Sequence, residues 1–321
     1  AVTRRFGQRY IGMYAYHEHS PPPTQATVHP HVIMSVATAF IKGGYTVDQL
    51  IDGWRARGAN IFGIREYYSV NTWDRDLPGA ARGANPAGLA NSIPHFHAKG
   101  ARMLSAESSD NWGPNGLGYY LAAQLLWDVD TADQLDALQD DFFTRAFGPA
   151  QEPMRAFYAL IDGAKRPLLS SDLVGRMYRQ LDAARQAAPD PAIRARIRDL
   201  LLYTRYVELF QAYEEARGAV RQAAFEAVIR HAYRIRATGM VHSYALYRDL
   251  AARDKSVQIP EGAAFNVPEK HNPWKSSAPF TEEEFAQILA QGIARNALLD
   301  FAPVSFSARL VPPAARQGKA A

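Results

Sequence analysis

The stretch "ARMLSAESSDNWGPNGLGYYLAAQLLWD", residues 101–128, decides the fold class. It opens with a short apolar run, becomes polar at Glu107, and continues as a long amphipathic pattern. A buried strand, a loop and a helix in this order are typical of a parallel β/α unit. Because parallel β/α folds carry their chemistry at the C-terminal ends of the strands, the carboxylate at position 107 marks a candidate site.

Three earlier segments show the same residue pattern, in which apolar, aromatic and β-branched residues are followed by polar ones. These segments are residues 8–19, 31–38 and 60–68. Residues 46–58 and 85–100 predict helices between strands, and a helix from Gly116 to Trp127 is predicted after the last strand. Strand, loop and helix repeating at about 40 residues indicate four parallel βα units in residues 1–128. A closed barrel needs eight. We therefore expect the C-terminal half of a (β/α)8 TIM barrel, with the N-terminal part of the same polypeptide missing.

The remainder of the chain is helical in pattern. Residues 129–255 predict an α-helical bundle, in which Thr131 is a candidate N-cap of the first helix. Residues 256–321 predict a loop, a helix that begins near Thr281, and a strand at 303–313 that leads toward a missing domain. The fold class expected is thus α/β, a partial barrel followed by a helical bundle.

Composition excludes several classes of protein. No run approaches the roughly 18 consecutive apolar residues of a membrane-spanning helix, so we expect no membrane span. The net charge of +4, from 36 basic and 32 acidic residues, is spread along the chain rather than gathered into a phosphate-binding stripe, so we expect no nucleic-acid partner. The absence of cysteine excludes disulfides, thiolate metal sites and a cysteine nucleophile. We expect no cofactor.

Two carboxylates stand at the ends of neighbouring predicted strands. Glu66 ends the third strand and Glu107 the fourth, so both are expected to project into one mouth several ångströms apart. A protonated and an ionised carboxyl at such a separation are what glycoside hydrolysis requires. Glu66 and Glu107 are therefore the catalytic candidates, without assignment of acid, base or nucleophile.

The surrounding loops suit a sugar. Flat aromatic rings offer stacking surfaces, short polar side chains suit hydroxyl groups, and Arg65 with Arg75 favours an acidic sugar such as a uronic acid. The predicted substrate-binding residues are Tyr16, His17, His19, Arg65, Tyr67, Trp73, Asp74, Asp110, Asn111, Trp112 and Asn115. An oligo- or polysaccharide is the expected substrate.

Two other classes of function stay open. The pattern His17-x-His19 at the end of a first strand is a metal signature of amidohydrolases, and a metal-dependent hydrolase would use both imidazoles. The pairs at His29 and His31 and at His95 and His97 lie at a strand start and in a helix, which weakens this reading. A sugar-binding protein without catalysis is the second alternative.

Several motifs resemble those of a bacterial family known as a domain of unknown function, DUF4838. The marks are Glu107, the Gly-Leu-x-x-Tyr run at 116–120, Leu126-Trp127-Asp128, Asp141-Phe142 and Phe147-Gly148. The likeness covers roughly residues 8–250. Since such domains often follow an α-glucuronidase-like N-terminal domain, the resemblance implies a glycoside-hydrolase-like barrel followed by helices. It also implies action on polysaccharide in the periplasm or outside the cell.

Overall fold

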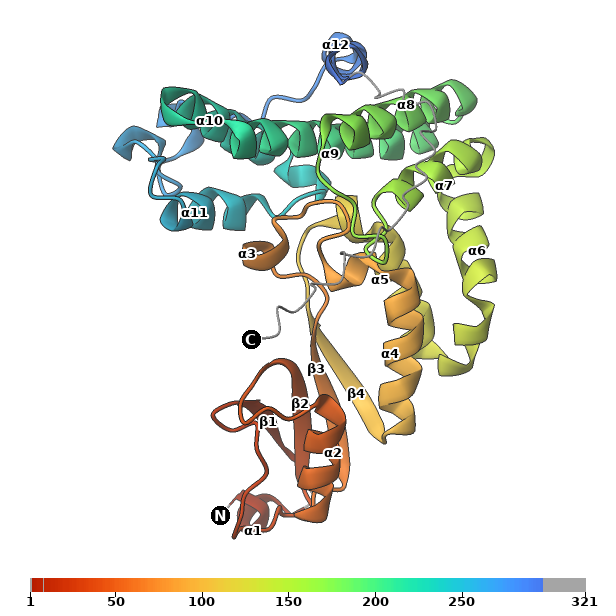
Figure 1. Ribbon diagram of the computed structural model, residues 1–321, viewed down its shortest axis with the longest axis vertical. Coiled ribbons are helices and arrows are strands. Elements are labelled where there is room, and N and C mark those ends of the chain that lie inside the picture. Colours follow the sequence, from red (N-terminus) through yellow and green to blue (C-terminus); the bar gives the residue numbers. More distant parts are fainter. Residues whose placement is uncertain (1, 8, 297–321) are drawn as a thin grey trace, which may run out of the picture.

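The computed structural model describes residues 2–7 and 9–296. Its sheet has four parallel strands in sequential order, β1-β2-β3-β4 (Figure 1). The strands are β1 (Ile11–His17), β2 (Val32–Ile41), β3 (Ile61–Tyr67) and β4 (Ala101–Glu107). The elements around them are α1 (Val2–Phe6), α2 (Val47–Ala56), α3 (Asn71–Asp74), η1 (Arg82–Ala84), α4 (Pro86–Ala98) and α5 (Trp112–Trp127). The predicted mixed α/β class with a parallel sheet and many helices is confirmed.

Helices cover one face of the sheet. Helix α2 begins with a capping box between Thr46 and Gln49, and its buried side chains Leu50, Ile51 and Trp54 pack on the apolar side chains of β2 and β3. Helix α4 packs beside α2 and meets α5 in a second small core. This is the arrangement of helices and sheet that a parallel β/α fold requires on each face it buries.

The opposite face of the sheet and the edge strand β1 are uncovered by the described residues. Along β1, Met13 and Tyr14 are both exposed although their side chains point to opposite faces. No helix follows β1, which corrects the prediction of four βα units to three. The prolines at 21–23 prevent a helix there, and this connection lies on α2 instead, where the Trp54 indole N–H donates to the carbonyl of Ser20 at 2.8 Å.

Helix α5 begins at Trp112, four residues before the predicted Gly116. The backbone N–H groups of Trp112 and Gly113 donate to the carbonyls of Gly239 and Met240, which satisfies two otherwise free donors of the first turn. A Cβ at position 113 would lie 2.5 Å from the Tyr203 ring, so only glycine allows this approach. Gly113 thus serves the close packing of α5 against α9.

The rest of the described chain is helical, as predicted. Its first long helix begins at Leu135, and Thr131 lies in the preceding 3-10 segment, where its hydroxyl donates to the carbonyl of Asp128, so the predicted N-cap is wrong. The elements are η2 (Val129–Gln134), α6 (Leu135–Phe147), η3 (Gly148–Ala150), α7 (Gln151–Leu160), α8 (Ser171–Ala187), α9 (Pro191–Glu215), α10 (Gly218–Arg234), η4 (Arg236–Thr238), α11 (Ser243–Arg253), η5 (Glu261–Ala263), η6 (Glu269–His271) and α12 (Glu282–Arg295). The predicted strand at 303–313 lies outside the described residues.

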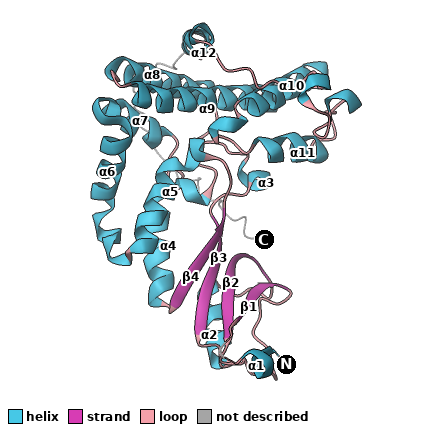
Figure 2. Ribbon diagram, turned by 180° about the vertical axis from the view of Figure 1, so that it is seen from behind, coloured by secondary structure: helices cyan, strands magenta, loops and turns pink. Residues whose placement is uncertain are grey.

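The helical part sits above the C-terminal ends of the strands (Figure 2). Two fully buried tyrosines of α9 join the two parts, because the Tyr203 hydroxyl donates to the carbonyl of Asp76 at 3.1 Å and the Tyr206 hydroxyl to that of Arg75 at 2.5 Å. Buried tyrosines usually find such a partner for the hydroxyl. Within residues 2–7 and 9–296, no helix is both long and apolar enough to cross a bilayer.

Candidate functional site

An open cleft of about 860 Å³ lies where the uncovered sheet face meets the loops at the C-terminal edge. Side chains from all four strands, from the loop after β3 and from the end of α11 border it. The lining residues are Tyr14, Tyr16, Phe40, Arg65, Tyr67, Val70, Thr72, Trp73, Glu107 and Arg253. Since open α/β sheets bind ligands at this edge, the cleft is the candidate site.

Four aromatic rings form a continuous wall of the cleft. The Phe40 ring centroid lies 5.6 Å from Tyr16, 6.0 Å from Tyr67 and 5.4 Å from Trp73. Tyr67 and Trp73 are themselves 5.4 Å apart. Phe40 and Trp73 are about half exposed, so the wall offers accessible aromatic faces rather than a closed core.

A bulge in β2 presents Phe40 to this wall. The register between β1 and β2 shifts after Ala15, and Phe40 has a φ of +56°, a conformation that is unusual for a bulky L-residue. His17, on the facing strand, has a φ of +50°. Backbone strain of this kind persists where the surrounding structure holds it, and it clusters at functional sites.

The polar centre of the cleft is an ion pair between Arg65 and Glu107. The Arg65 Nη2 donates to Glu107 Oε2 at 2.8 Å, and the guanidinium lies 5.2 Å from the Tyr67 ring centroid. The Glu107 side chain is 42% exposed. A ligand in the cleft can therefore reach both a carboxylate and a guanidinium.

Glu66 lies on the other face of the sheet, so the expected pair of carboxylates does not form. The register of β3 and β4 places Tyr67 opposite Glu107 and Glu66 opposite Ala106, and neighbouring positions on a strand point to opposite faces. Glu66 Oε1 accepts from the Thr38 hydroxyl, the Tyr67 backbone N–H and the Arg82 guanidinium at 2.7–2.8 Å. Its side chain is only 9% exposed, on the helix-covered side.

Three predicted sugar ligands are buried and hydrogen-bonded within the protein, which corrects their assignment. Asp74, Asn111 and Asn115 are at most 4% exposed. Asp74 and Asn111 belong to a group that we call the buried polar network, which is Ser69, Asn71, Asp74, Asp76 and Asn111. Because Asp76 also accepts from the backbone N–H of His242 at 2.8 Å, the network fastens the helical part to the sheet.

Other predicted residues lie outside the cleft lining. Asp110 is exposed on the loop after β4, and Trp112, the first residue of α5, is half exposed and packs against Tyr119. His17 and His19 are exposed at the end of β1, where His17 Nδ1 lies 3.5 Å from Glu18. The structure brings Tyr16, Arg65, Tyr67, Trp73 and Glu107 together in the cleft lining, to which the remaining predicted residues do not belong.

The metal hypothesis gains no support from the geometry. No group of three or more His, Asp or Glu side chains that could hold a metal ion occurs in the described ranges. His31 and His29 lie just before β2, and His95 on α4 contacts Asp48 at 2.8 Å. The three His-x-His pairs therefore do not converge.

Sequence reasoning missed several lining residues. Tyr14 had a signal, because it alternates with Tyr16 along β1 and therefore shares its face. Phe40 and Arg253 had no signal in the local sequence. The position of Phe40 depends on the bulge in β2, and that of Arg253 depends on how α11 packs over the sheet.

The fold and the cleft define a mixed α/β protein with an aromatic, charged site at the C-terminal edge of a parallel sheet. Residues 1–159 match the model of a family described as a domain of unknown function, DUF4838. This part of the chain, which contains the sheet and nearly the whole cleft lining, belongs to that family. Comparisons with curated proteins and with solved structures gave no match.

Proposed function

We propose that the cleft binds an oligo- or polysaccharide and that the chain is part of a carbohydrate-active protein. The observation that supports saccharide binding is the aromatic wall of the cleft beside the Arg65–Glu107 ion pair. The wall consists of Tyr16, Phe40, Tyr67 and Trp73. Pyranose rings present C–H faces that stack on aromatic rings, while their hydroxyl groups need charged or polar partners at the same depth. An open cleft of about 860 Å³ has room for more than one sugar unit.

Glycosidic hydrolysis is the activity that we propose for this site, with Glu107 as one catalytic carboxylate. Hydrolysis requires a second carboxyl about 5–9.5 Å away, and Glu66 on the opposite face cannot supply it. The uncovered sheet face supports a partial (β/α)8 barrel, because parallel sheets are normally covered on both faces. Strands from further polypeptide would close the barrel, turn the open face into its interior, and supply the second carboxylate.

The charge of the cleft favours an acidic sugar. The cleft lining contains two arginines, Arg65 and Arg253, and a single carboxylate, that of Glu107. Arg75, the second arginine expected from the sequence, lies outside the lining and donates to Asn71 Oδ1 at 3.4 Å. A uronic acid would place its carboxylate between the two lining arginines, where bidentate hydrogen bonds are available.

Sugar binding is tested by titrating the chain with neutral and uronic-acid-containing oligosaccharides and following tryptophan fluorescence or heat. Trp73→Ala should weaken binding about fivefold, since an aromatic contact is worth about 1 kcal/mol. Trp127→Ala is the matched control, because Trp127 is 92% exposed and lies outside the cleft. Equal affinity of the parent and Trp73→Ala, or no binding of any saccharide, would contradict the proposal.

Hydrolysis is tested with aryl glycosides, including glucuronides, on the polypeptide extended by its flanking natural sequence. Glu107→Gln should abolish turnover while sugar binding persists. Full turnover by this variant would remove Glu107 from the mechanism. Binding without turnover by the parent protein would establish a sugar-binding protein instead.

A further inference from the structure

A second cavity, of about 470 Å³, lies in the helical part between α9, α10, α12 and the segment 273–280. It is distinct from the cleft on the sheet and shares no residue with it. The lining contains four cationic side chains and one carboxylate. These are Arg205, Arg230, Arg234, Lys275 and Glu284.

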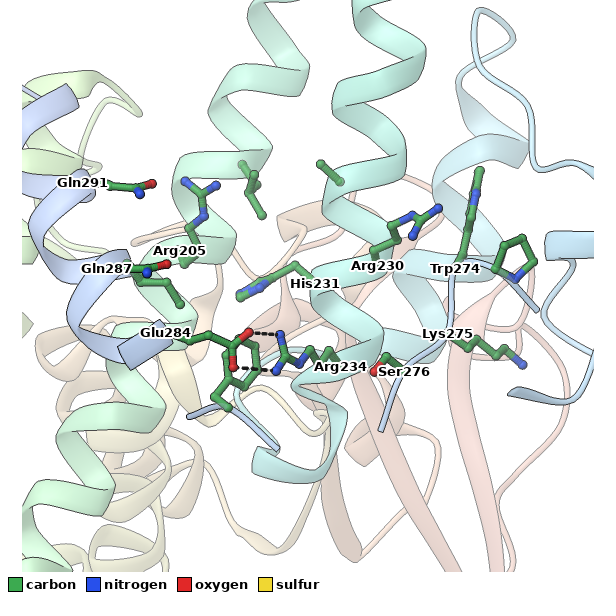
Figure 3. A pocket seen from close by; sticks show the side chains of 15 residues that line it. Arg205, Arg230, His231, Arg234, Trp274, Lys275, Ser276, Glu284, Gln287 and Gln291 are labelled. Carbon is green, nitrogen blue, oxygen red and sulfur yellow. Dashed lines mark hydrogen bonds and ion pairs between the residues drawn. The ribbon is translucent and has the colours of Figure 1, made fainter. Parts of the chain in front are cut away.

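One wall of this cavity is a polar stripe of α12. Glu284, Gln287 and Gln291 follow the helical spacing of three and four residues and point toward α9 and α10 (Figure 3). The packing face of α12 is a different one, where Gly292 approaches the Tyr178 ring so closely that a Cβ would lie 2.4 Å from it. Of this stripe, Glu284 holds α12 through its pair with Arg234 and its capping box with Thr281, and Gln287 and Gln291 lie away from the contact of Gly292 with Tyr178.

The floor of the cavity is a saturated ion pair. Arg234 Nη1 and Nη2 donate to the two oxygens of Glu284 at 2.6 and 2.8 Å, and Arg234 Nε donates to the carbonyl of Ala278. The Phe280 ring centroid lies 3.7 Å from the guanidinium carbon. This pair is complete without a ligand and shapes the site rather than recognising one.

Arg205 differs, because its guanidinium is held but not saturated. Its Nη1 donates to Glu208, which the Tyr178 hydroxyl and the Asn296 amide also contact. The Arg205 guanidinium also lies within hydrogen-bond range of the Tyr178 hydroxyl. Its five N–H donors have no further hydrogen-bond partner among the residues that the structure describes, although the side chain is only 24% exposed. A tethered guanidinium with free donors is preorganised for an oxyanion.

The neighbouring groups complete a donor set. Gln291 Oε1 accepts from Arg295, which leaves its amide N–H groups to donate toward the cavity. The His231 Nε2 lies 2.9 Å from the carbonyl of Leu202, and desolvation lowers the pKa of this imidazole to about 4, so the ring is neutral at pH 7. Charge recognition in the cavity therefore falls to the arginines.

We propose that this cavity is a binding site for a small molecule that carries a carboxylate or a phosphate group. Arg205 binds the oxyanion through its free guanidinium N–H groups, Gln291 donates from α12, and Trp274 and Phe280 bound the remainder of the molecule. An uncharged sugar of the same size offers Arg205 only neutral acceptors and therefore binds more weakly than an oxyanion. The site is independent of the saccharide cleft.

The test is calorimetric titration of the chain with glucuronate, inorganic phosphate and glucose. Glucuronate and phosphate distinguish the two sources of the oxyanion, and glucose has no charge. Arg205→Gln and Gln291→Ala should weaken binding of the oxyanion, the first by about 10- to 100-fold because it removes charged hydrogen bonds. Arg194→Gln is the matched control, since Arg194 is an exposed arginine on the same helix outside the cavity.

Thermal unfolding of each variant shows whether it retains the parental fold. Binding of glucuronate or phosphate that is lost in Arg205→Gln and weakened in Gln291→Ala, but kept in Arg194→Gln, supports the site. Binding of neither oxyanion at about 10 mM overturns it, as does equal binding of glucose. Oxyanion binding that survives in both Arg205→Gln and Gln291→Ala also overturns it. Binding that is lost on Trp73→Ala would instead assign the signal to the saccharide cleft and overturn a second site.

Discussion

We predict that the contribution of the buried Asp76 side chain to the free energy of unfolding falls as the pH rises from about 4 to about 7. Asp76 is 0% exposed and accepts from the Asn71 and Asn111 amides and the His242 backbone N–H. Burial, and next the charge of Asp74, raise the pKa of Asp76 to about 7 from 3.8. The folded state therefore binds the proton more tightly than the unfolded state, so this contribution is complete below pH 3.8 and is lost by pH 7.

Replacing Asp76 with asparagine removes the protonation of this side chain, so the variant separates the pH-dependent contribution from that of the hydrogen bonds. The variant places an NH2 group against the Asn111 amide, which cannot rotate because it also donates to Ser69 and accepts from Tyr119. That mismatch costs about 1–3 kcal/mol at every pH. One pH unit corresponds to about 1.4 kcal/mol, so the parent loses roughly 2–3 kcal/mol between pH 5 and pH 8 that Asp76→Asn does not lose.

Urea unfolding at pH 5 and pH 8, followed by circular dichroism, measures the difference. We expect Asp76→Asn to be clearly less stable than the parent at pH 5 and to reach or exceed its stability at pH 8. Other groups that titrate in this window, such as His231 with its lowered pKa and Asp199 with its raised one, are common to both proteins and cancel. An equal difference in free energy of unfolding at the two pH values would refute the reasoning.

Three further predictions test the assignment of faces and the close packing. Glu66→Gln should lower the free energy of unfolding by about 1–3 kcal/mol and leave saccharide affinity unchanged. Glu107→Gln should change the free energy of unfolding by less than about 1 kcal/mol. A larger loss of stability for Glu107→Gln than for Glu66→Gln in urea titrations would contradict the placement of the two side chains. Gly118→Ala should destabilise the protein by more than about 3 kcal/mol, because the new Cβ would lie 1.6 Å from the Gly83 carbonyl oxygen. Gly116→Ala on the same helix is the control, since its Cβ would lie 3.3 Å from the nearest atom. Similar melting temperatures of the two variants would contradict this prediction. Thr46→Ala should cost about 1 kcal/mol by removing the cap of α2, and an unchanged midpoint of urea unfolding would contradict that role.

The sequence predicted the strands and most helices because their signals are local. Short apolar runs gave all four strands, and apolar spacing gave α2 through Leu50, Ile51 and Trp54. The start of α5 was missed because its first N–H groups are satisfied by Gly239 and Met240, far along the chain. Such partners have no mark in the local sequence.

The candidate site was predicted only in part, for two physical reasons. The position of a residue at a strand end predicts which edge of the sheet it lies at, but not which face its side chain points to. Glu66 is one residue out of register with Glu107, so Glu107 points into the cleft and Glu66 points to the helix-covered face. Short polar residues after a strand suit a sugar and a buried network equally well. Asp74 and Asn111 belong to the network because α9 and α11 pack over them, which only the tertiary structure shows.

The uncovered strand β1 has a consequence for handling the chain. Ile11, Met13, Tyr14 and Tyr16 leave exposed apolar side chains on an edge strand, and none of the described strands pairs with its outer edge, which a strand from another molecule could therefore join. Purified material should therefore tend to aggregate as concentration rises, and light scattering would follow it. A lysine in place of Met13 should improve solubility, since an edge charge opposes the addition of a foreign strand.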